Sequence, residues 1–383
     1  MASEKAPGTS GTTTDMLKNL PQDAKRLLAE LIQQYWEQPN CDFETWHMNI
    51  LSLIYKGKGN TKDPKNWRPV CLKETTAKIV SAIVASRLLS HIEKIGTPNQ
   101  FGHIGCQEAL HTIRNILITR RLHGKETYVL FVDLVKAFDT VIHEALFTIL
   151  TKYGIPQNLI TVIKKMYHTV KLSFTIGKEK RFIDYTKGVF QGDNASPVLF
   201  LYIMLAATDT FKNNHTHHNA PIYNYFPDNK NPSKQHGRLV RQPTTSKGTT
   251  LSVDHILYVD DGAFISTTRE GIESITQALY THLAKFGLKM HVGKNNEESK
   301  TLAMLIPPSL EQSKENIKNR FLPPKILINN GQNYIPFTNE FKYLGSIIHI
   351  TLQEDEEIKK RIKQAWSTIG IMKHFLKNKD IDL

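Results

Sequence analysis

This 383-residue sequence has few cysteines, no long apolar run and no secretion signal. Its 3 cysteines, Cys41, Cys71 and Cys106, are odd in number and widely spaced, which predicts neither a disulfide framework nor paired zinc ligands. The longest apolar run, Val198 to Ala207, is well short of the roughly 20 residues that a membrane-spanning helix needs. Residues 1–15 contain no apolar stretch of the secretory type. We therefore expect a protein that stays inside a reducing cell compartment and is not an integral membrane protein.

Acidic residues are also in deficit. The 36 aspartates and glutamates are outnumbered by 49 lysines and arginines, which leaves a net charge of +13. Such a surplus indicates a polyanionic partner, either nucleic acid or a membrane surface, and charge alone does not choose between them. Hydrophobic residues make up 40% of the chain, enough for a sizeable core in about two or three domains.

Hydrophobic periodicity predicts an alternation of helices and short strands after a tail, residues 1–20, whose polar composition predicts disorder. Helices are expected from Pro21 to Tyr35, 79–92, 143–153, from Ser196-Pro197 to 207, 272–286 and from 354 onward. Strands are expected at 128–132, 255–259 and 262–265, with a further hairpin over 174–183 around Gly177-Lys178.

Residues 212–250 change abruptly in composition to Asn, His, Pro, Lys and Thr, which predicts a long polar insertion or loop. The segment holds His215, His217 and His218, but their spacing fits no familiar ligand frame and no cysteine accompanies them. We interpret these histidines as part of a solvated loop.

Three carboxylates stand where predicted strands end or turn: Asp133 directly after the apolar run 128–132, and Asp260 with Asp261 at a hairpin tip. A carboxylate against an apolar strand is costly unless a cation neutralises it. Two adjacent aspartates and a third from a neighbouring strand can hold two Mg²⁺ ions for displacement at phosphorus. An isolated Asp-Asp-Gly, however, is more often simple turn chemistry.

Seven short motifs decide between these readings of the aspartates. They are WRPVCL (67–72), NQFG (99–102), FVDLVKAFDTV (131–141), GVFQGDNASPVLF (188–200), YVDD (258–261), ESKTLAM (298–304) and FKYLG (341–345). In this order the chain resembles the reverse transcriptases of non-LTR retrotransposons and group II introns. The resemblance extends from about residue 22 to the early 370s.

The resemblance implies an α+β protein with the right-hand polymerase fold: a palm with an antiparallel βαββαβ-like sheet, helical fingers and a truncated thumb. Its implied boundaries are a disordered tail at 1–20, fingers at 21–127, palm at 128–210 with a fingers insertion at about 150–185, a low-complexity insertion at 211–250, palm again at 251–346 and the start of a thumb at 347–383. No endonuclease or RNase H domain is expected within these residues.

The resemblance also assigns roles to single residues. Asp133, Asp260 and Asp261 match the catalytic metal-binding triad, which implies two Mg²⁺ ions, with Mn²⁺ as a substitute. Phe138 matches an aromatic gate that excludes the ribose 2′-hydroxyl, although an aromatic there also suits a core. Gln191 and Gly192 match a pair beneath the templating base and the incoming nucleotide. Arg68 matches a fingers residue that grips the triphosphate, and Lys300 a proton donor to pyrophosphate, where a plain surface lysine would also fit.

The implied function is RNA-directed DNA polymerisation, with an RNA template, a DNA primer and dNTPs as partners. Two alternatives stay open: a catalytically impaired retroelement remnant that binds RNA through its basic surface, and an RNA-dependent RNA polymerase with the same palm. The sequence departs from the family pattern after NQFG, where His103-Ile104-Gly105 stands in place of a basic stretch. An intracellular location is expected, with the nucleus an option for a eukaryotic retroelement.

Overall fold

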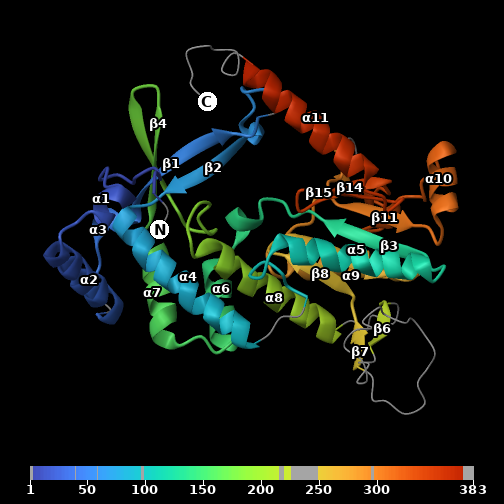
Figure 1. Ribbon diagram of the computed structural model, residues 1–383. Helices are drawn as coiled ribbons and strands as arrows, with labels where there is room; N and C mark the ends of the chain where they lie inside the picture. Colours follow the sequence, from blue (N-terminus) through green and yellow to red (C-terminus); the bar gives the residue numbers. More distant parts are fainter. Residues whose placement is uncertain are drawn as a thin grey trace, which may run out of the picture. The chain divides into compact units, whose positions relative to one another are not determined.

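A computed structural model of the chain describes residues 3–38, 40–57, 59–95, 99–214, 220–225, 249–294 and 297–373. The chain forms two compact units, each assembled from several stretches of sequence (Figure 1). The first unit contains Met1–His103, Leu134–His215 and Leu279–Met290. The second contains Ile104–Asp133, Thr216–Ala278 and His291–Leu383.

The first unit is largely helical and carries one four-stranded sheet, in the order β2-β1-β4-β5. Its helices are α1 (Thr14–Lys18), α2 (Gln22–Glu37), α3 (Glu44–His47), α4 (Thr75–Ile95), α6 (His143–Lys152), α7 (Gln157–Tyr167) and α8 (Ser196–Asn214), with short 3-10 turns η1 (Pro64–Asn66) and η2 (Ala137–Thr140). Its strands are β1 (Met48–Tyr55), β2 (Trp67–Leu72), β4 (Lys171–Ile176) and β5 (Glu179–Asp184).

The local predictions for this unit are confirmed where the pattern is strong. The β4–β5 hairpin turns at the expected place, with Ile176 opposite Glu179. Helix α8 begins at Ser196 and buries the apolar run that follows it, as a helix with an apolar surface on every side must. Helix α4 buries Val84, Leu88 and Ile92 on its inner face.

The N-terminal segment differs from the predicted disordered tail. Helix α1 forms within it, capped by the Thr13 side chain, which accepts a hydrogen bond from the backbone N–H of Met16. The segment before α1 is fastened to Glu74, whose carboxylate accepts hydrogen bonds of 2.6 Å from the Ser10 backbone N–H and from the Ser10 and Thr9 hydroxyls. Composition predicted no order here because the stabilising partner is a carboxylate far along the chain.

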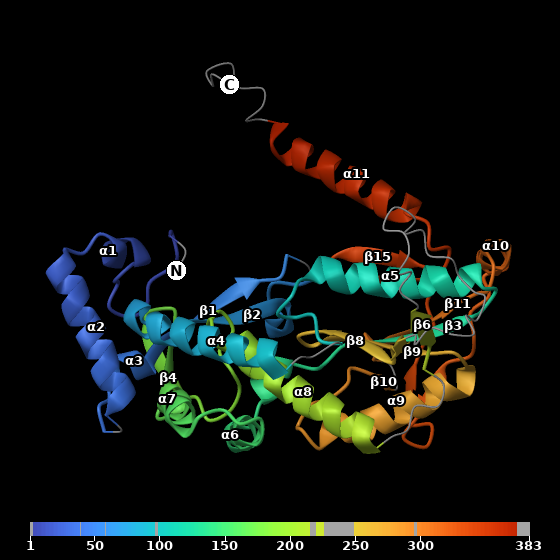
Figure 2. The same ribbon diagram turned by 60° about the horizontal axis from the view of Figure 1, so that its bottom comes forward.

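The second unit is built on an antiparallel sheet in the order β11-β3-β9-β8. These strands are β3 (Thr127–Val132), β8 (His255–Tyr258), β9 (Asp261–Ser266) and β11 (Leu302–Ile306). All six residues of β3 are buried, because the strand lies between β11 and β9 and is covered on both faces. Helix α5 (Cys106–Leu122) lies along this sheet and contacts β3 and β8 (Figure 2).

The rest of the second unit consists of short strand pairs and helices. They are β6 (Ile222–Tyr225) with β7 (Thr249–Ser252), β10 (Gly293–Lys294) with β12 (Ile326–Ile328) and β13 (Asn333–Ile335), β14 (Glu340–Tyr343) with β15 (Ser346–His349), and helices α10 (Leu310–Lys318) and α11 (Asp355–Ile371). Helix α9 (Arg269–Ala284) begins in this unit and ends in the first. Helices α9 and α11 confirm the predicted amphipathic segments.

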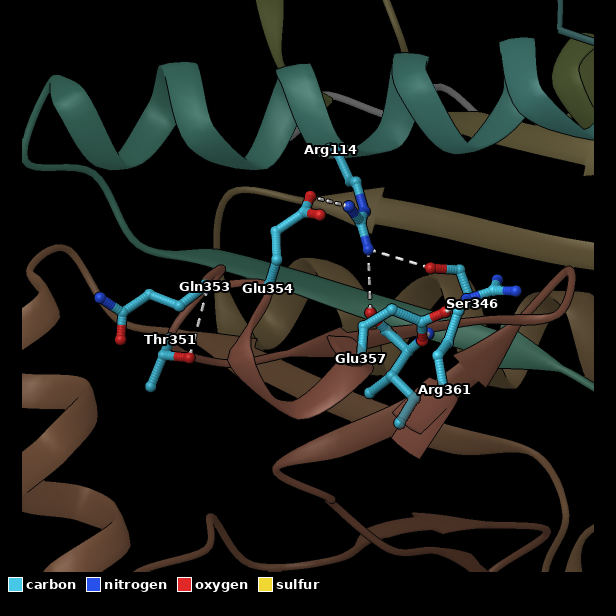
Figure 3. Close-up of polar contacts among 8 residues, drawn as sticks. Arg114, Ser346, Thr351, Gln353, Glu354, Glu357 and Arg361 are labelled. Atoms are coloured by element: carbon cyan, nitrogen blue, oxygen red, sulfur yellow. Dashed lines mark hydrogen bonds and ion pairs between the residues drawn. The ribbon is translucent and has the colours of Figure 1, made fainter. Parts of the chain in front are cut away.

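Helix α11 is tied at its first turn to α5 and β15 (Figure 3). The Arg114 guanidinium pairs with Glu354 and donates to the Ser346 hydroxyl at 3.0 Å and the Ile347 carbonyl at 3.2 Å. Glu357 accepts from the Ile347 backbone N–H at 2.8 Å. Beyond this first turn, the apolar stripe of α11 is about half exposed. It consists of Ile358, Ile362, Trp366 and Ile369.

Most of the predicted insertion, including His215, His217 and His218, lies outside the described residues. Its described ends form the antiparallel pair β6–β7, in which Ile222 is opposite Ser252. Among the helices that the structure describes, none has the length and apolar character needed to cross a membrane.

Candidate active site

The three aspartates singled out in the sequence lie together at one end of the second unit's sheet. Strand β3 pairs with β9 as far as Val132 opposite Gly262, and Asp133 and Asp261 are the residues that adjoin this last pair. Asp260 lies in the turn that joins β8 to β9, where Tyr258 pairs with Asp261. Two segments separated by about a third of the chain thus bring their carboxylates close enough to interact.

The turn that carries Asp260 has an unusual backbone. Val259, its first residue, has φ 56°, a left-handed conformation that is rare for β-branched side chains and is normally taken by glycine. Strain of this kind costs about 1–3 kcal/mol and persists where the surrounding structure enforces it. Tyr343 contributes to that surrounding: its hydroxyl donates to the carbonyls of Ile256 and Asp261 at 3.4 and 3.5 Å.

Burial and neighbouring negative charge raise the pKa of Asp260 and of Asp261. Burial raises the pKa of Asp260 above its usual 3.8, against a hydrogen bond from its own backbone N–H, and the charge of Asp133 raises it further. Burial, followed by the charges of Asp260 and Asp133, raises the pKa of Asp261 to about 6, although part of that side chain is open to solvent. A cation placed among the three would relieve this repulsion.

Asp133 is held in place by residues that come from the other end of the sequence. Its backbone N–H donates to the Thr301 hydroxyl at 3.1 Å, and its carbonyl accepts from the His291 backbone N–H at 2.8 Å. Lys300, the predicted proton donor, is the residue before Thr301 and is exposed, and its backbone N–H donates to the His291 ring. Sequence reasoning missed Thr301 and His291, for which only the neighbouring Lys300 motif was a signal.

The side chains of Asp133, Asp260 and Asp261 offer a divalent metal only carboxylate oxygens. Carboxylate oxygens are the ligands that Mg²⁺ prefers, and the burial and neighbouring charge that raise the pKa of Asp260 and Asp261 would both be offset by a bound cation. Across the described part of the chain, no three His, Cys, Asp or Glu side chains converge closely enough to form a ready-made metal cluster. The residues thus fit a divalent cation in chemistry, and their carboxylates would have to converge further on binding it.

The other predicted site residues belong to the first unit. Arg68 is exposed on β2, opposite Ile54 of β1. Phe138 lies in η2, where its ring stacks on Phe200 of α8 with centroids 5.1 Å apart and planes at 10°. Phe138 is only partly buried. This position accommodates both the predicted gate and the simple packing role.

Gln191 and Gly192 form a tight turn that contacts β2. The Gln191 side-chain amide is 3.5 Å from Asp139, and its backbone carbonyl accepts from the Cys71 N–H at 2.9 Å. Gly192 has φ 98°, and a Cβ there would lie 3.1 Å from the Val70 side chain. Both the backbone conformation and the close approach require glycine.

Comparison with known proteins identifies the class to which this fold and site belong. A family model described as "Reverse transcriptase (RNA-dependent DNA polymerase)" matches residues 56–348, more than half of the chain. The chain therefore belongs to the reverse transcriptase family, as its seven motifs predicted. The matched region includes all three aspartates and every other predicted site residue.

Relatives of known description agree with this family. The chain is similar to the Retrovirus-related Pol polyproteins from type-1 retrotransposable element R2 of Nasonia vitripennis and Bradysia coprophila. It is 23% identical to the first over 346 residues, which is 89% of this chain and 29% of the relative. It is 24% identical to the second over 347 residues, or 90% and 35%. The chain thus spans about a third of the length of these relatives.

One solved structure, of apo telomerase from Candida tropicalis truncated from its C-terminal domain, aligns over 86% of this chain and 59% of its own. The TM-score is 0.48 at 12% identity. A likeness at this level carries no argument about function.

Proposed function

We propose that this chain is the RNA-directed DNA polymerase core of a non-LTR retroelement protein, which extends a DNA primer with dNTPs on an RNA template. The observation that carries the proposal is the placement of Asp133, Asp260 and Asp261 at one sheet end within a chain of the reverse transcriptase family. In polymerase terms, residues 21–127 would be the fingers, 128–210 and 251–346 the palm with a fingers insertion at about 150–185, and 347–383 the start of the thumb.

The three carboxylates would hold two divalent ions, Mg²⁺ by preference and Mn²⁺ as a substitute. Bound there, the ions would make the primer 3′-hydroxyl a nucleophile near neutral pH and neutralise the charge that develops on the triphosphate. Thr301 and His291 fix the Asp133 backbone, so its carboxylate presents one orientation to that site.

The remaining roles belong to the first unit and to Lys300. Arg68 would grip the triphosphate with a bidentate guanidinium contact. Phe138, fixed by its stacking on Phe200, would exclude a ribose 2′-hydroxyl and so select dNTPs. Gln191 and Gly192 would lie beneath the nascent base pair. Lys300 would protonate the departing pyrophosphate.

The test is primer extension on an RNA template with the parent chain and with Asp260→Asn/Asp261→Asn. We expect Mg²⁺-dependent dNTP incorporation by the parent and none by the double variant. Asp184→Asn, which removes an exposed carboxylate at the end of β5, serves as the matched control and should keep parental activity. If the folded parent incorporates no dNTP with any divalent metal, the proposal is refuted.

The same assay separates the two alternatives. Salt-dependent RNA binding without incorporation would identify an RNA-binding remnant, which the +13 charge alone also supports. Incorporation of NTPs in preference to dNTPs would identify an RNA polymerase. Phe138→Ala should relax the dNTP preference of a reverse transcriptase, because removal of the ring leaves room for a 2′-hydroxyl.

A further inference from the structure

A buried ion pair between Lys73 and Asp193 adjoins the Gln191-Gly192 turn, and none of the roles assigned above involves it. Lys73 is the residue after β2, and Asp193 is the residue after Gly192. The Lys73 Nζ and Asp193 Oδ1 atoms are 3.5 Å apart, with side-chain exposures of 3% and 0%. Charged side chains are almost never this deeply buried unless they are paired.

The surroundings of Asp193 are only partly arranged to stabilise its charge. The Ser81 hydroxyl of α4 donates to Oδ1 at 2.6 Å and itself accepts from the Ala195 N–H at 3.3 Å. The second carboxylate oxygen, Oδ2, is buried and has no hydrogen-bond partner among the described residues. A buried pair with one oxygen left unsatisfied contributes little net stability, since the cost of removing two charges from water offsets their attraction.

The geometry of the pair relates it to the position of the turn. Asp193 follows the turn and Phe190 precedes it, and Lys73 reaches both, with its Nζ 5.1 Å from the Phe190 ring centroid. The Phe190 ring is itself stacked on Tyr167 and Tyr185 at 4.9 and 4.4 Å. Lys73 therefore contacts both sides of the turn from the β2 side.

Two further contacts hold the same turn against β2. The Cys71 N–H donates to the Gln191 carbonyl, and a Cβ at Gly192 would lie 3.1 Å from the Val70 side chain. Neither contact involves a charge, and each depends on how closely the turn approaches the backbone and the Val70 side chain of β2. The attraction between Lys73 and Asp193 draws together the two segments on which both contacts depend.

We propose that Lys73 and Asp193 are positioning residues for the incoming nucleotide: their charge attraction sets how closely the Gln191-Gly192 turn packs against β2. This rests on the proposed function, in which that turn lies beneath the nascent base pair. The pair touches neither substrate nor metal in this account, so its loss should weaken nucleotide binding more than it slows the chemical step.

The experiment compares Lys73→Met, Asp193→Asn and the double variant with the parent. It measures kcat and KM for one dNTP on an RNA template, the melting temperature and the exchange rate of the Cys71 amide. We expect each variant to raise the KM about tenfold while kcat stays within about threefold, and the Cys71 amide to exchange about tenfold faster. The double variant should regain the parental melting temperature, because it leaves no charge buried alone.

Ile92→Ala is the control for simple destabilisation. Ile92 is fully buried on α4, about 16 Å along the helix from Ser81. This variant should lower the melting temperature and leave both the KM and the Cys71 exchange rate unchanged. This control therefore distinguishes the effect of lower stability from the effect of a displaced Gln191-Gly192 turn.

A double variant with the parental KM and parental Cys71 exchange would overturn the proposal, because the pair would then serve only to neutralise two buried charges. Single variants that melt earlier but keep the parental KM would overturn it as well. If the parent incorporates no dNTP, the proposed function fails, and Cys71 exchange in the double variant still decides whether the pair positions the turn.

Discussion

Replacement of Arg121 by methionine should open the connection between α5 and the base of α11. The Arg121 guanidinium donates to the carbonyls of Pro307 at 3.2 Å and Thr351 at 2.5 Å, to the carbonyl of Ile350, and to the Ser313 hydroxyl at 3.2 Å. One side chain of α5 thus holds both the β11–α10 connection and the segment that leads into α11.

The cost follows from what each acceptor loses. The Ile350 carbonyl keeps a hydrogen bond from the Ser313 hydroxyl at 3.2 Å, so it is not left without a donor. The carbonyls of Pro307 and Thr351 lose a charged donor, and hydrogen bonds of that type contribute about 1.5–3 kcal/mol each. Because Arg121 is only half-buried and water can replace part of the loss, we expect a total of about 3 kcal/mol.

Amide hydrogen exchange measures this quantity locally. The Leu352 N–H donates to the His349 carbonyl at 2.8 Å, within the segment that Arg121 holds. A loss of about 3 kcal/mol should speed its exchange roughly 150-fold. Arg181→Met, which removes an arginine with 64% side-chain exposure in the first unit, is the matched control and should change stability by less than about 0.5 kcal/mol. An acceleration at Leu352 below about tenfold would refute the reasoning.

Three further outcomes are expected. Burial opposes ionisation of Glu74, but hydrogen bonds from Ser10 and Thr9 prevail and lower its pKa below the usual 4.5. The hydrogen bonds between Glu74 and residues 9–10 therefore stabilise the protein above that pH, and this stabilisation is lost as the pH falls through the folded-state pKa. Proteolysis of residues 6–12 should increase over that pH range in the parent, and in Glu74→Gln it should be faster at neutral pH and independent of pH. Glu357→Gln should cost about 1–2 kcal/mol of α11 stability, measured as faster exchange of the Ile347 amide. Gly192→Ala should cost about 1–3 kcal/mol in thermal unfolding, and a variant that melts with the parent would contradict the required positive φ.

The elements of this chain could be predicted from its sequence because their signals are local. Alternation and turn residues located the β8–β9 hairpin, and the position of Asp133 and Asp260 at strand ends indicated a shared site before any family was considered. The register that ends with Val132 opposite Gly262, beside Asp133 and Asp261, is set by the buried β3, whose apolar run was plain in the sequence.

Contacts between distant parts of the sequence could not be predicted in the same way. Lys73 and Asp193 are separated by much of the first unit's sequence, and their burial depends on packing that no local pattern encodes. The tie between Ser10 and Glu74 was missed for the same reason, since a polar segment reads as disordered until its partner is known. Helix α11 was predicted correctly, but periodicity alone does not say how much of its apolar stripe is covered.

The order of β11-β3-β9-β8 has a consequence for synthesis on the ribosome. Strand β3 is made first, yet both of its neighbours, β9 and β11, come much later in the chain. Its six buried positions must therefore wait for residue Ile306 to emerge before the sheet can close around them. Sheets that depend on such distant pairings fold slowly and expose aggregation-prone strands in the meantime. Premature termination before β11 would thus leave β3 without a neighbour on one edge, and nascent chains of this protein are expected to require chaperones until β11 has been translated.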